Sequence, residues 1–180
     1  MTNQEIANLK VQLMHANVPL CEWGTNGCKT ITDLAKEIDA GECAIENRHG
    51  KLYRYTRVML LDIVYHNTTT DEKFHLIQKE QVASRGETER VYRSSVSEKL
   101  KQGEVPDKDA IKRAIHEELG ITWDGFYIEK LEPYFTLTKA KSYLGIATIA
   151  TIYPYSVLLS DEQFNPSGYT ETQDGITTNF

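Results

Sequence analysis

The chain has 180 residues, with 26 acidic against 20 basic side chains and a formal net charge of −6. A pI near 5.4 argues against a nucleic-acid groove or an anionic membrane surface as the main partner, because both favour a basic stripe. The composition, 40% hydrophobic and 26% charged, is that of a folded globular protein, and the length suits one core.

The cysteines and the first residues indicate a compartment. Cys21, Cys28 and Cys43 are odd in number and show no C-x-x-C spacing, so neither a disulfide framework nor a zinc site is supported. No apolar run is long enough to span a bilayer, and the start, MTNQEIANLK, lacks the basic and apolar regions of a signal peptide. We expect a cytoplasmic protein with free thiols and no membrane partner.

Residues 1–50 are expected to form a helical extension ahead of a main domain at 51–180. Apolar residues at helical spacing follow Thr2, which predicts a first helix. Thr30 with Asp33 resembles the capping box of a second, shorter helix that ends at Gly41. Trp23, in the connector, is expected to anchor the extension.

Beyond residue 50 the chain becomes rich in β-branched and aromatic residues. Val58 to Val64 are typical of a strand buried on both faces, and TTTDE marks the turn that follows. A weaker strand is predicted from Arg90 to Val96. After a central helix come two more strand segments, DGFYIEKLEPYFTLT and SYLGIATIATIYPYSV, the second of which should end at Pro154.

The tail from Leu159 is polar and is expected to hold a helical turn and a last edge strand. Strands therefore flank one central helix on both sides in the sequence. This order indicates an α+β or a layered α/β/α fold, not regular βαβ winding.

The central helix, GEVPDKDAIKRAIHEELGI, combines an apolar arc with acidic side chains. Advancing 100° per residue places Glu118 close to the centre of the arc, and Glu117 at its edge beside Arg113. A carboxylate that faces a core is costly unless it is paired, protonated or bound to metal. Its partner would be a buried arginine, backbone donors, or a divalent cation such as Mg²⁺ or Mn²⁺.

The segment RAIHEELGI, Arg113 to Ile121, resembles the second half of the Nudix box, G-x5-E-x7-R-E-U-x-E-E-x-G-U with U an aliphatic residue. GEVPDKDA is similar to the preceding part of that box. The resemblance implies an α/β/α sandwich built on a mixed sheet, whose loop–helix–loop holds Mg²⁺ or Mn²⁺ against a diphosphate. It also implies that Glu117 and Glu118 are metal ligands and that Arg113 braces the loop.

The chain departs from the box at three positions. Lys99 stands where the box has its leading glycine. Ala114 stands where the box has a glutamate that acts as base or additional metal ligand. Val105 stands eight residues before Arg113, so Glu104 matches only if the loop is one residue longer. Glu98 and Glu104 are candidate replacement carboxylates, with Glu104 as a further metal ligand.

Other candidates lie outside the box. The base would come from Glu98, Glu162 or Glu171, although a glutamate in any one of these settings is more often a surface residue than a base. Lys99, Lys101 and Arg93 are candidate contacts for substrate phosphates. The expected partner is a small-molecule nucleotide diphosphate, and a homodimer is left open.

Three functions are compatible with these residues. The first is a Mg²⁺-dependent Nudix hydrolase that cleaves a diphosphate bond in a nucleoside-diphosphate-linked substrate. The second, suggested by Ala114, is a nucleotide-binding or regulatory module without catalysis. The third, an isoprenoid diphosphate isomerase, is disfavoured because that activity needs a cysteine where the segment RSSVSEK offers serine.

Overall fold

The structure is a computed structural model that describes residues 1–25, 27–83, 88–93, 96–122, 125, 127–140, 142–173 and 175–180; at 83, 88–93 and 173 it describes the backbone alone. The chain divides into two compact units, where the sequence indicated one core. Unit 1 comprises Met1–Val58, Lys99–Glu104 and Pro133–Ile152. Unit 2 comprises Met59–Glu98, Val105–Glu132 and Tyr153–Phe180.

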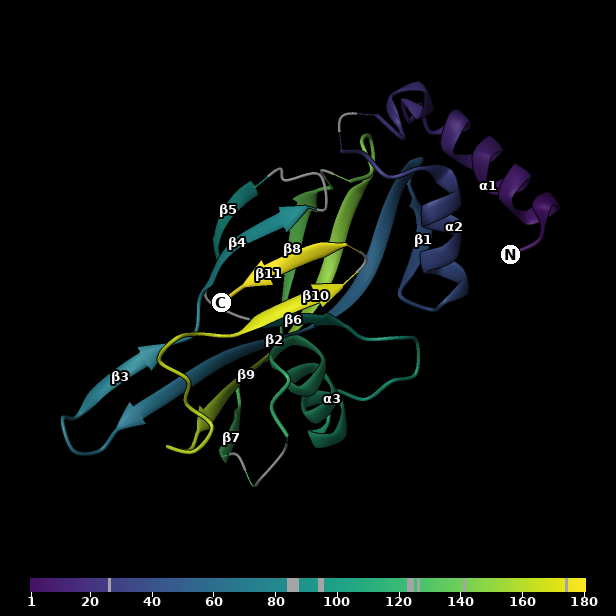
Figure 1. Cartoon of the computed structure of the whole chain (residues 1–180). Coiled ribbons are helices and arrows are strands. Elements are labelled where there is room, and N and C mark those ends of the chain that lie inside the picture. Colours follow the sequence, from purple (N-terminus) through teal and green to yellow (C-terminus); the bar gives the residue numbers. More distant parts are fainter. Residues whose placement is uncertain are drawn as a thin grey trace. The chain divides into compact units, whose positions relative to one another are not determined.

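Helices and strands alternate irregularly along the chain (Figure 1). The helices are α1 (Asn3–His15), the 3-10 turn η1 (Leu20–Glu22), α2 (Ile31–Asp39) and α3 (Lys108–Leu119). The strands are β1 (Cys43–Arg48), β2 (Lys51–Asn67), β3 (Glu72–His75), β4 (Gln78–Ala83), β5 (Thr88–Arg93), β6 (Val96–Lys99), β7 (Tyr127–Lys130), β8 (Tyr134–Lys139), β9 (Ala147–Leu159), β10 (Thr170–Gln173) and β11 (Ile176–Asn179).

The larger sheet has seven strands in the order β1-β2-β9-β7, with β3 and β6 pairing with β2 and β8 pairing with β9. The β1–β2, β2–β3, β7–β9 and β8–β9 pairs are antiparallel. In Figure 1 the long strands β2 and β9 run in the same direction, so the sheet is mixed. The expected α/β fold with a mixed sheet is confirmed.

A second sheet of four strands, in the order β10-β11-β4-β5, lies in unit 2 and was not foreseen from the sequence. Its described pairs are antiparallel. The tail supplies a hairpin to it, where one edge strand was expected. The single strand predicted from Arg90 to Val96 is also wrong, because β5 ends at Arg93 in this sheet while β6 starts at Val96 and pairs with β2.

The strand β9 continues past Pro154, which was expected to end it. Residues 147–152 pair with β8, and residues 155–158 pair with β7. Pro154 has no N–H to donate, and it lies between these two ladders, where its carbonyl accepts the N–H of Leu131 at 3.0 Å. A proline is therefore tolerated inside a central strand because the strand changes partner there.

The strand β2 is covered unequally on its two faces. Met59, Leu61 and Ile63 are fully buried, whereas the alternating Leu60 and Asp62 are partly exposed. The prediction of a strand buried on both faces is therefore corrected: β2 has one core face and one partly covered face.

Both expected N-terminal helices are present in unit 1. Thr2 caps α1 and Thr30 caps α2, each in a capping box with the acidic residue three positions later. Trp23 packs on Tyr143, with ring centroids 5.2 Å apart, and its Nε1–H donates to the carbonyl of Leu144 at 3.0 Å. Its role as an anchor is confirmed, and its partner is the segment just before β9.

Candidate active site

The helix α3 is fixed at both ends by its own sequence. The Asp107 side chain accepts hydrogen bonds from the N–H groups of Asp109 and Ala110, both at 3.0 Å. Gly120 ends the helix with a left-handed φ of 66°, a conformation that glycine adopts without strain. Tyr155 of β9 donates a hydrogen bond to the carbonyl of Pro106, just before the helix. These contacts hold the start of α3 against the larger sheet.

The side chain of Glu118 projects from α3 at the boundary between the buried face of the helix and solvent. Ala110, Ile111, Ala114, Ile115 and Leu119 form the buried face, and Glu118 is half-buried beside it. Burial raises the pKa of Glu118 to about 7, helped by the charges of Glu171, Glu98 and Glu117. Among the described residues, no hydrogen bond or ion pair reaches its carboxylate. Within the described part of the chain, Glu118 therefore lacks the buried arginine or backbone donors that were one alternative.

The two distant carboxylates come from separate strands of unit 2. Glu98 lies on β6 and Glu171 on β10, which packs against α3. Both side chains are half-buried. Burial raises the pKa of Glu171, while contact with Thr178 across the β10–β11 hairpin lowers it in part. Two of the three candidate bases thus lie close enough to raise the pKa of Glu118.

Glu117 and Arg113 lie on the exposed side of α3. Arg113 Nε is 4.0 Å from Glu117 Oε1, one helical turn away, and both side chains are well exposed. Glu117 therefore lies beside Arg113, as expected.

The donor chemistry of this cluster suits a hard divalent cation. The charges of three carboxylates, Glu171, Glu98 and Glu117, act on the half-buried Glu118, and oxygen-only ligand sets are those of Mg²⁺ and Mn²⁺. Within the part of the chain that the structure describes, no three Asp, Glu, His or Cys side chains converge tightly enough to form a finished metal site. The residue types therefore fit a metal, while the side chains do not form a closed ligand set.

The remaining predicted residues have other surroundings. Glu104 belongs to unit 1, where its carboxylate accepts the N–H of Lys101 at 2.8 Å and closes a turn. Glu162 is exposed in the turn after β9. Lys101 is exposed as well, and the side chain of Arg93 lies outside the described part of the chain. Lys99 forms ion pairs with two carboxylates of unit 1.

Unit 1 contains a charged cluster that the sequence did not reveal. Glu37, only 7% exposed, lies 2.6 Å from Lys29 Nζ, 2.5 Å from Arg54 Nη2 and 3.3 Å from Lys99 Nζ. Burial would raise the pKa of Glu37, but the hydrogen bonds from Lys29 and Arg54 and the charges of Arg54 and Lys99 hold it at about 2. These four residues are scattered over about 70 positions, and no motif connects them.

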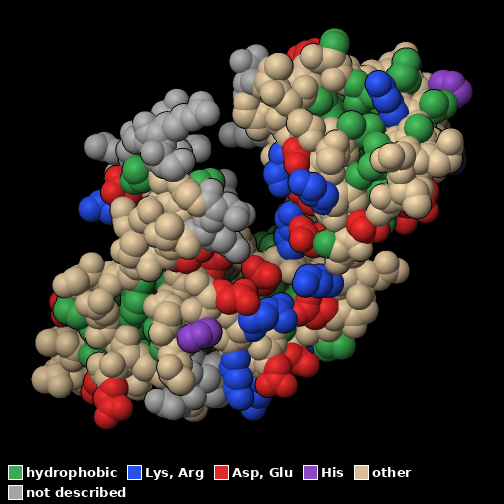
Figure 2. All heavy atoms as spheres, turned by 45° about the vertical axis from the view of Figure 1, so that its right-hand side comes forward, with side chains coloured by type: hydrophobic (Ala, Val, Ile, Leu, Met, Phe, Trp, Pro, Cys, Tyr) green, Lys and Arg blue, Asp and Glu red, His purple; other side chains and the backbone are tan. Residues whose placement is uncertain are grey.

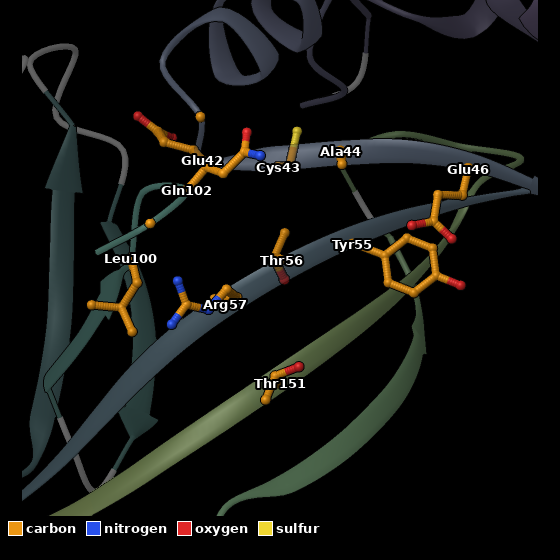
Figure 3. A pocket seen from close by; sticks show the side chains of 12 residues that line it. Glu42, Cys43, Ala44, Glu46, Tyr55, Thr56, Arg57, Leu100, Gln102 and Thr151 are labelled. Carbon is orange, nitrogen blue, oxygen red and sulfur yellow. The ribbon is translucent and has the colours of Figure 1, made fainter. Parts of the chain in front are cut away.

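A cavity of about 370 Å³ opens beside this cluster, between β1, β2 and the 99–104 loop (Figure 3). Arg57 points toward Leu100 in this view, and its guanidinium donates to the carbonyl of Glu104 at 2.8 Å. Glu42 on the same wall pairs with Lys99 at 3.0 Å. The charged groups of this cavity thus have partners within unit 1.

The visible surface in Figure 2 carries acidic and basic side chains interspersed, and its described residues form no uniformly basic stripe. This distribution agrees with the net charge of −6. Among the described helices, none has the length and apolar character needed to cross a membrane.

Comparison with known proteins gives only distant similarity. No protein-family model matches the chain, and no curated protein matches it. The match to an Ap4A hydrolase of C. elegans covers 69% of this chain and 80% of the hydrolase chain, with 14% identity and a TM-score of 0.37. The match to a binary complex of a C. elegans Ap4A hydrolase covers 59% of this chain and 69% of the hydrolase chain, with 15% identity and a TM-score of 0.34.

A third solved structure is a MutT/nudix family protein from Enterococcus faecalis. The match covers 83% of this chain and 58% of that protein's chain, with 12% identity and a TM-score of 0.39. Similarities this low do not place the chain in a family. The residues around α3 must therefore carry any assignment of function.

Proposed function

We propose that the protein is a Mg²⁺- or Mn²⁺-dependent hydrolase that cleaves a diphosphate bond in a nucleoside-diphosphate-linked substrate. The observation that carries this proposal is the electrostatic state of Glu118. Its pKa is raised to about 7 because it is half-buried among three other carboxylates. An ionised Glu118 is costly there without a cation, and a divalent metal would favour its ionised form.

Glu117 and Glu118 would hold the metal, with Glu98 and Glu171 as the neighbouring carboxylates. A bound metal would neutralise the phosphoryl oxygens of the substrate as negative charge develops there. The agreement of Arg113, Glu117 and Glu118 with the Nudix-type spacing supports the same assignment. Glu104, which closes a turn in unit 1, is not needed as a ligand.

Glu171 or Glu98 would act as the base in place of the glutamate that Ala114 replaces. Ala114 is fully buried, so no carboxylate is available at that position. The base takes a proton from a water molecule whose oxygen attacks phosphorus, and the bridging P–O bond breaks with its electron pair leaving on the departing phosphate. Glu171 suits this role because its raised pKa makes it a better proton acceptor near neutral pH.

The first experiment measures Mn²⁺ binding by electron paramagnetic resonance for the wild type and for Glu118→Gln. We expect loss of binding in the variant by about tenfold or more. Affinity in the wild type should fall by up to about tenfold per pH unit below pH 7, because Glu118 must lose its proton to bind metal. Affinity that is independent of pH and of Glu118→Gln would exclude this cluster as the metal site.

The second experiment follows turnover of a panel of nucleoside-diphosphate compounds by phosphorus NMR with Mg²⁺ or Mn²⁺ present. Glu171→Gln and Glu98→Gln identify the base, since the variant lacking it should lose about 10²-fold or more in kcat with metal affinity less affected. Metal binding without turnover of any compound would refute the hydrolase.

A second function, a nucleotide-binding or regulatory module without catalysis, is favoured by one observation. Ala114 removes the glutamate expected next to Arg113. This function predicts saturable nucleotide binding that persists in Glu171→Gln and Glu98→Gln, with no turnover in the wild type. The isomerase is not proposed, because the three cysteines, Cys21, Cys28 and Cys43, all lie in unit 1 and none lies near α3 in the sequence.

A further inference from the structure

A second cavity of unit 1, about 290 Å³ in volume, borders the Glu37 cluster. Its wall carries four basic side chains, Lys29, Arg54, Lys99 and Lys139, and one acidic side chain, Glu37. Glu42 pairs with Lys99 from outside the wall. Basic groups therefore exceed acidic groups by two even when Glu42 is counted.

Three buried polar atoms at this cavity lack a hydrogen-bond partner among the described residues: Arg54 Nε, Tyr143 Oη and Thr148 Oγ1. Tyr143 is 1% exposed and Thr148 is 8% exposed. Tyr143 lies near Glu37 without a hydrogen bond of good geometry. Burial, followed by the Glu37 charge, raises the pKa of Tyr143 and keeps its hydroxyl protonated. Buried polar groups are normally satisfied. Among the described residues Thr148 Oγ1 has no hydrogen-bond partner. The contacts of Arg54 with Cys43 and of Tyr143 with Glu37 fall short of good hydrogen-bond geometry, so the cavity suits a polar occupant.

We propose that this cavity binds a phosphate group, either as free phosphate or as part of a small molecule. An excess of basic side chains with unused N–H and O–H donors favours an anion with several oxygen acceptors. Water could satisfy the hydroxyls of Tyr143 and Thr148, but it would not balance the charge. The volume is near the lower end of the ~300–1,000 Å³ range of small-molecule sites.

Glu37 prepares the cavity for this occupant. By pairing with Lys29, Arg54 and Lys99 it fixes three cations at one wall before any ligand arrives. Lys139 is exposed at the end of β8 and adds a charge that no described carboxylate pairs with. Preorganised donors of this kind lower the entropy cost of binding.

The proposal does not depend on the function proposed for the α3 cluster, and the test separates the two. Inorganic phosphate and glycerol phosphate are titrated into the full chain by calorimetry, near neutral pH with EDTA present. EDTA removes divalent metal, and the metal-free carboxylates around Glu118 repel phosphate. Saturable binding of either probe is therefore expected to come from the basic cavity.

Two substitutions test residues that line the cavity, and a third substitution is the matched control. Thr148→Val removes an unpartnered hydroxyl and should weaken binding about fivefold or more. Lys139→Gln should weaken it about fivefold. Lys51→Gln removes the same charge from an exposed position on β2 of unit 1 and should change affinity by less than about twofold.

The melting temperature distinguishes a phosphate-binding role of Thr148 from a purely structural one. Without phosphate, Thr148→Val should melt no lower than the wild type, because it removes a buried hydroxyl that has no partner. With phosphate, the wild type should gain in Tm and the variant should gain less.

Tighter binding of glycerol phosphate than of inorganic phosphate assigns the site to a phosphorylated small molecule, and the reverse order assigns it to free phosphate. No saturable binding of either probe in the millimolar range would overturn the proposal and leave a purely structural ion-pair cluster. Binding that Thr148→Val and Lys139→Gln do not alter would overturn it as well.

Discussion

Two glutamates on amphipathic helices, Glu37 of α2 in unit 1 and Glu118 of α3 in unit 2, are both shielded from water, but their pKa values shift in opposite directions. The pKa of Glu37 is about 2, and that of Glu118 is about 7. Burial acts in the same direction on both. The difference comes from their neighbours, which are three cations around Glu37 and three carboxylates around Glu118.

This contrast distinguishes a carboxylate that is balanced within the chain from one for which we propose a functional role. Glu37 is balanced by side chains of its own chain, so it stabilises unit 1 without help from outside. Glu118 is surrounded by like charge, so its ionised form needs a cation that the described residues do not supply. Strongly perturbed carboxylates of the second kind are typical of functional sites.

The largest effect is expected from Glu37→Gln. The substitution keeps the shape of the side chain but leaves Arg54, itself 8% exposed, without its counter-charge. The free energy of unfolding should fall by about 3–5 kcal/mol, measured by urea denaturation near neutral pH. Glu46→Gln, which removes an exposed partner 3.3 Å from Arg48, is the matched control and should cost less than about 1 kcal/mol. Equal losses of unfolding free energy in the two variants would show that Glu37 stabilises unit 1 no more than an exposed ion pair does.

Acid should remove the same stabilisation in the wild type. The folded pKa of Glu37 lies below its ordinary value of 4.5, so its contribution is present above pH 4.5 and is lost as the pH falls toward 2. We expect this residue to account for about 2–3 kcal/mol over that interval. The quantity to measure is the difference in unfolding free energy between wild type and Glu37→Gln, which should narrow as the pH falls. A constant difference would mean that Glu37 titrates normally.

The opposite sign is expected for Glu118→Gln in metal-free buffer. The folded pKa of Glu118 lies above its ordinary value of 4.5, so the stability it contributes is fully present below pH 4.5 and is lost as the pH rises through about 7. Above pH 7 the variant should therefore be more stable than the wild type by about 1–2 kcal/mol, less than the full shift because the side chain is partly exposed. Denaturation at several pH values checks this, and a variant that is less stable at every pH would contradict it.

The smallest effect on stability is expected from Glu117→Gln, next to Glu118 on the same helix. Glu117 is exposed and its ion pair with Arg113 measures 4.0 Å, so the free energy of unfolding should change by about 0.2–0.5 kcal/mol. In a Mn²⁺ titration the same variant should lose affinity, as expected of a ligand. A large change in stability with unchanged metal affinity would assign Glu117 a structural role instead.

Local patterns in the sequence were sufficient for the helices. Thr2 and Thr30 predicted caps that the structure contains, and the central segment holds the expected helix, α3. The helical period placed Glu118 close to the centre of the apolar arc, whereas the structure places it half-buried beside that face. Each of these features depends on residues within one or two turns of each other, so sequence spacing captures them.

Strand ends were less predictable because they depend on distant partners. Pro154 is a sound reason to end a strand, yet β9 continues because its partner changes from β8 to β7 at that position. The strand expected from Arg90 to Val96 is divided because β5 and β6 join different sheets. The hydrogen-bond register that decides both cases involves residues far apart in the chain.

The sequence by itself determined the three helices, the presence of strands at β2 and in the first half of β9, and the pair Glu117 and Glu118 near the apolar side of α3, because caps and periodicity act locally. Only the tertiary structure decided which distant charges surround each buried glutamate. It placed Glu98 and Glu171 near Glu118, and Lys29, Arg54 and Lys99 around Glu37. A carboxylate's charge state follows from neighbours within a few ångströms, and chain folding selects those neighbours independently of their separation in sequence.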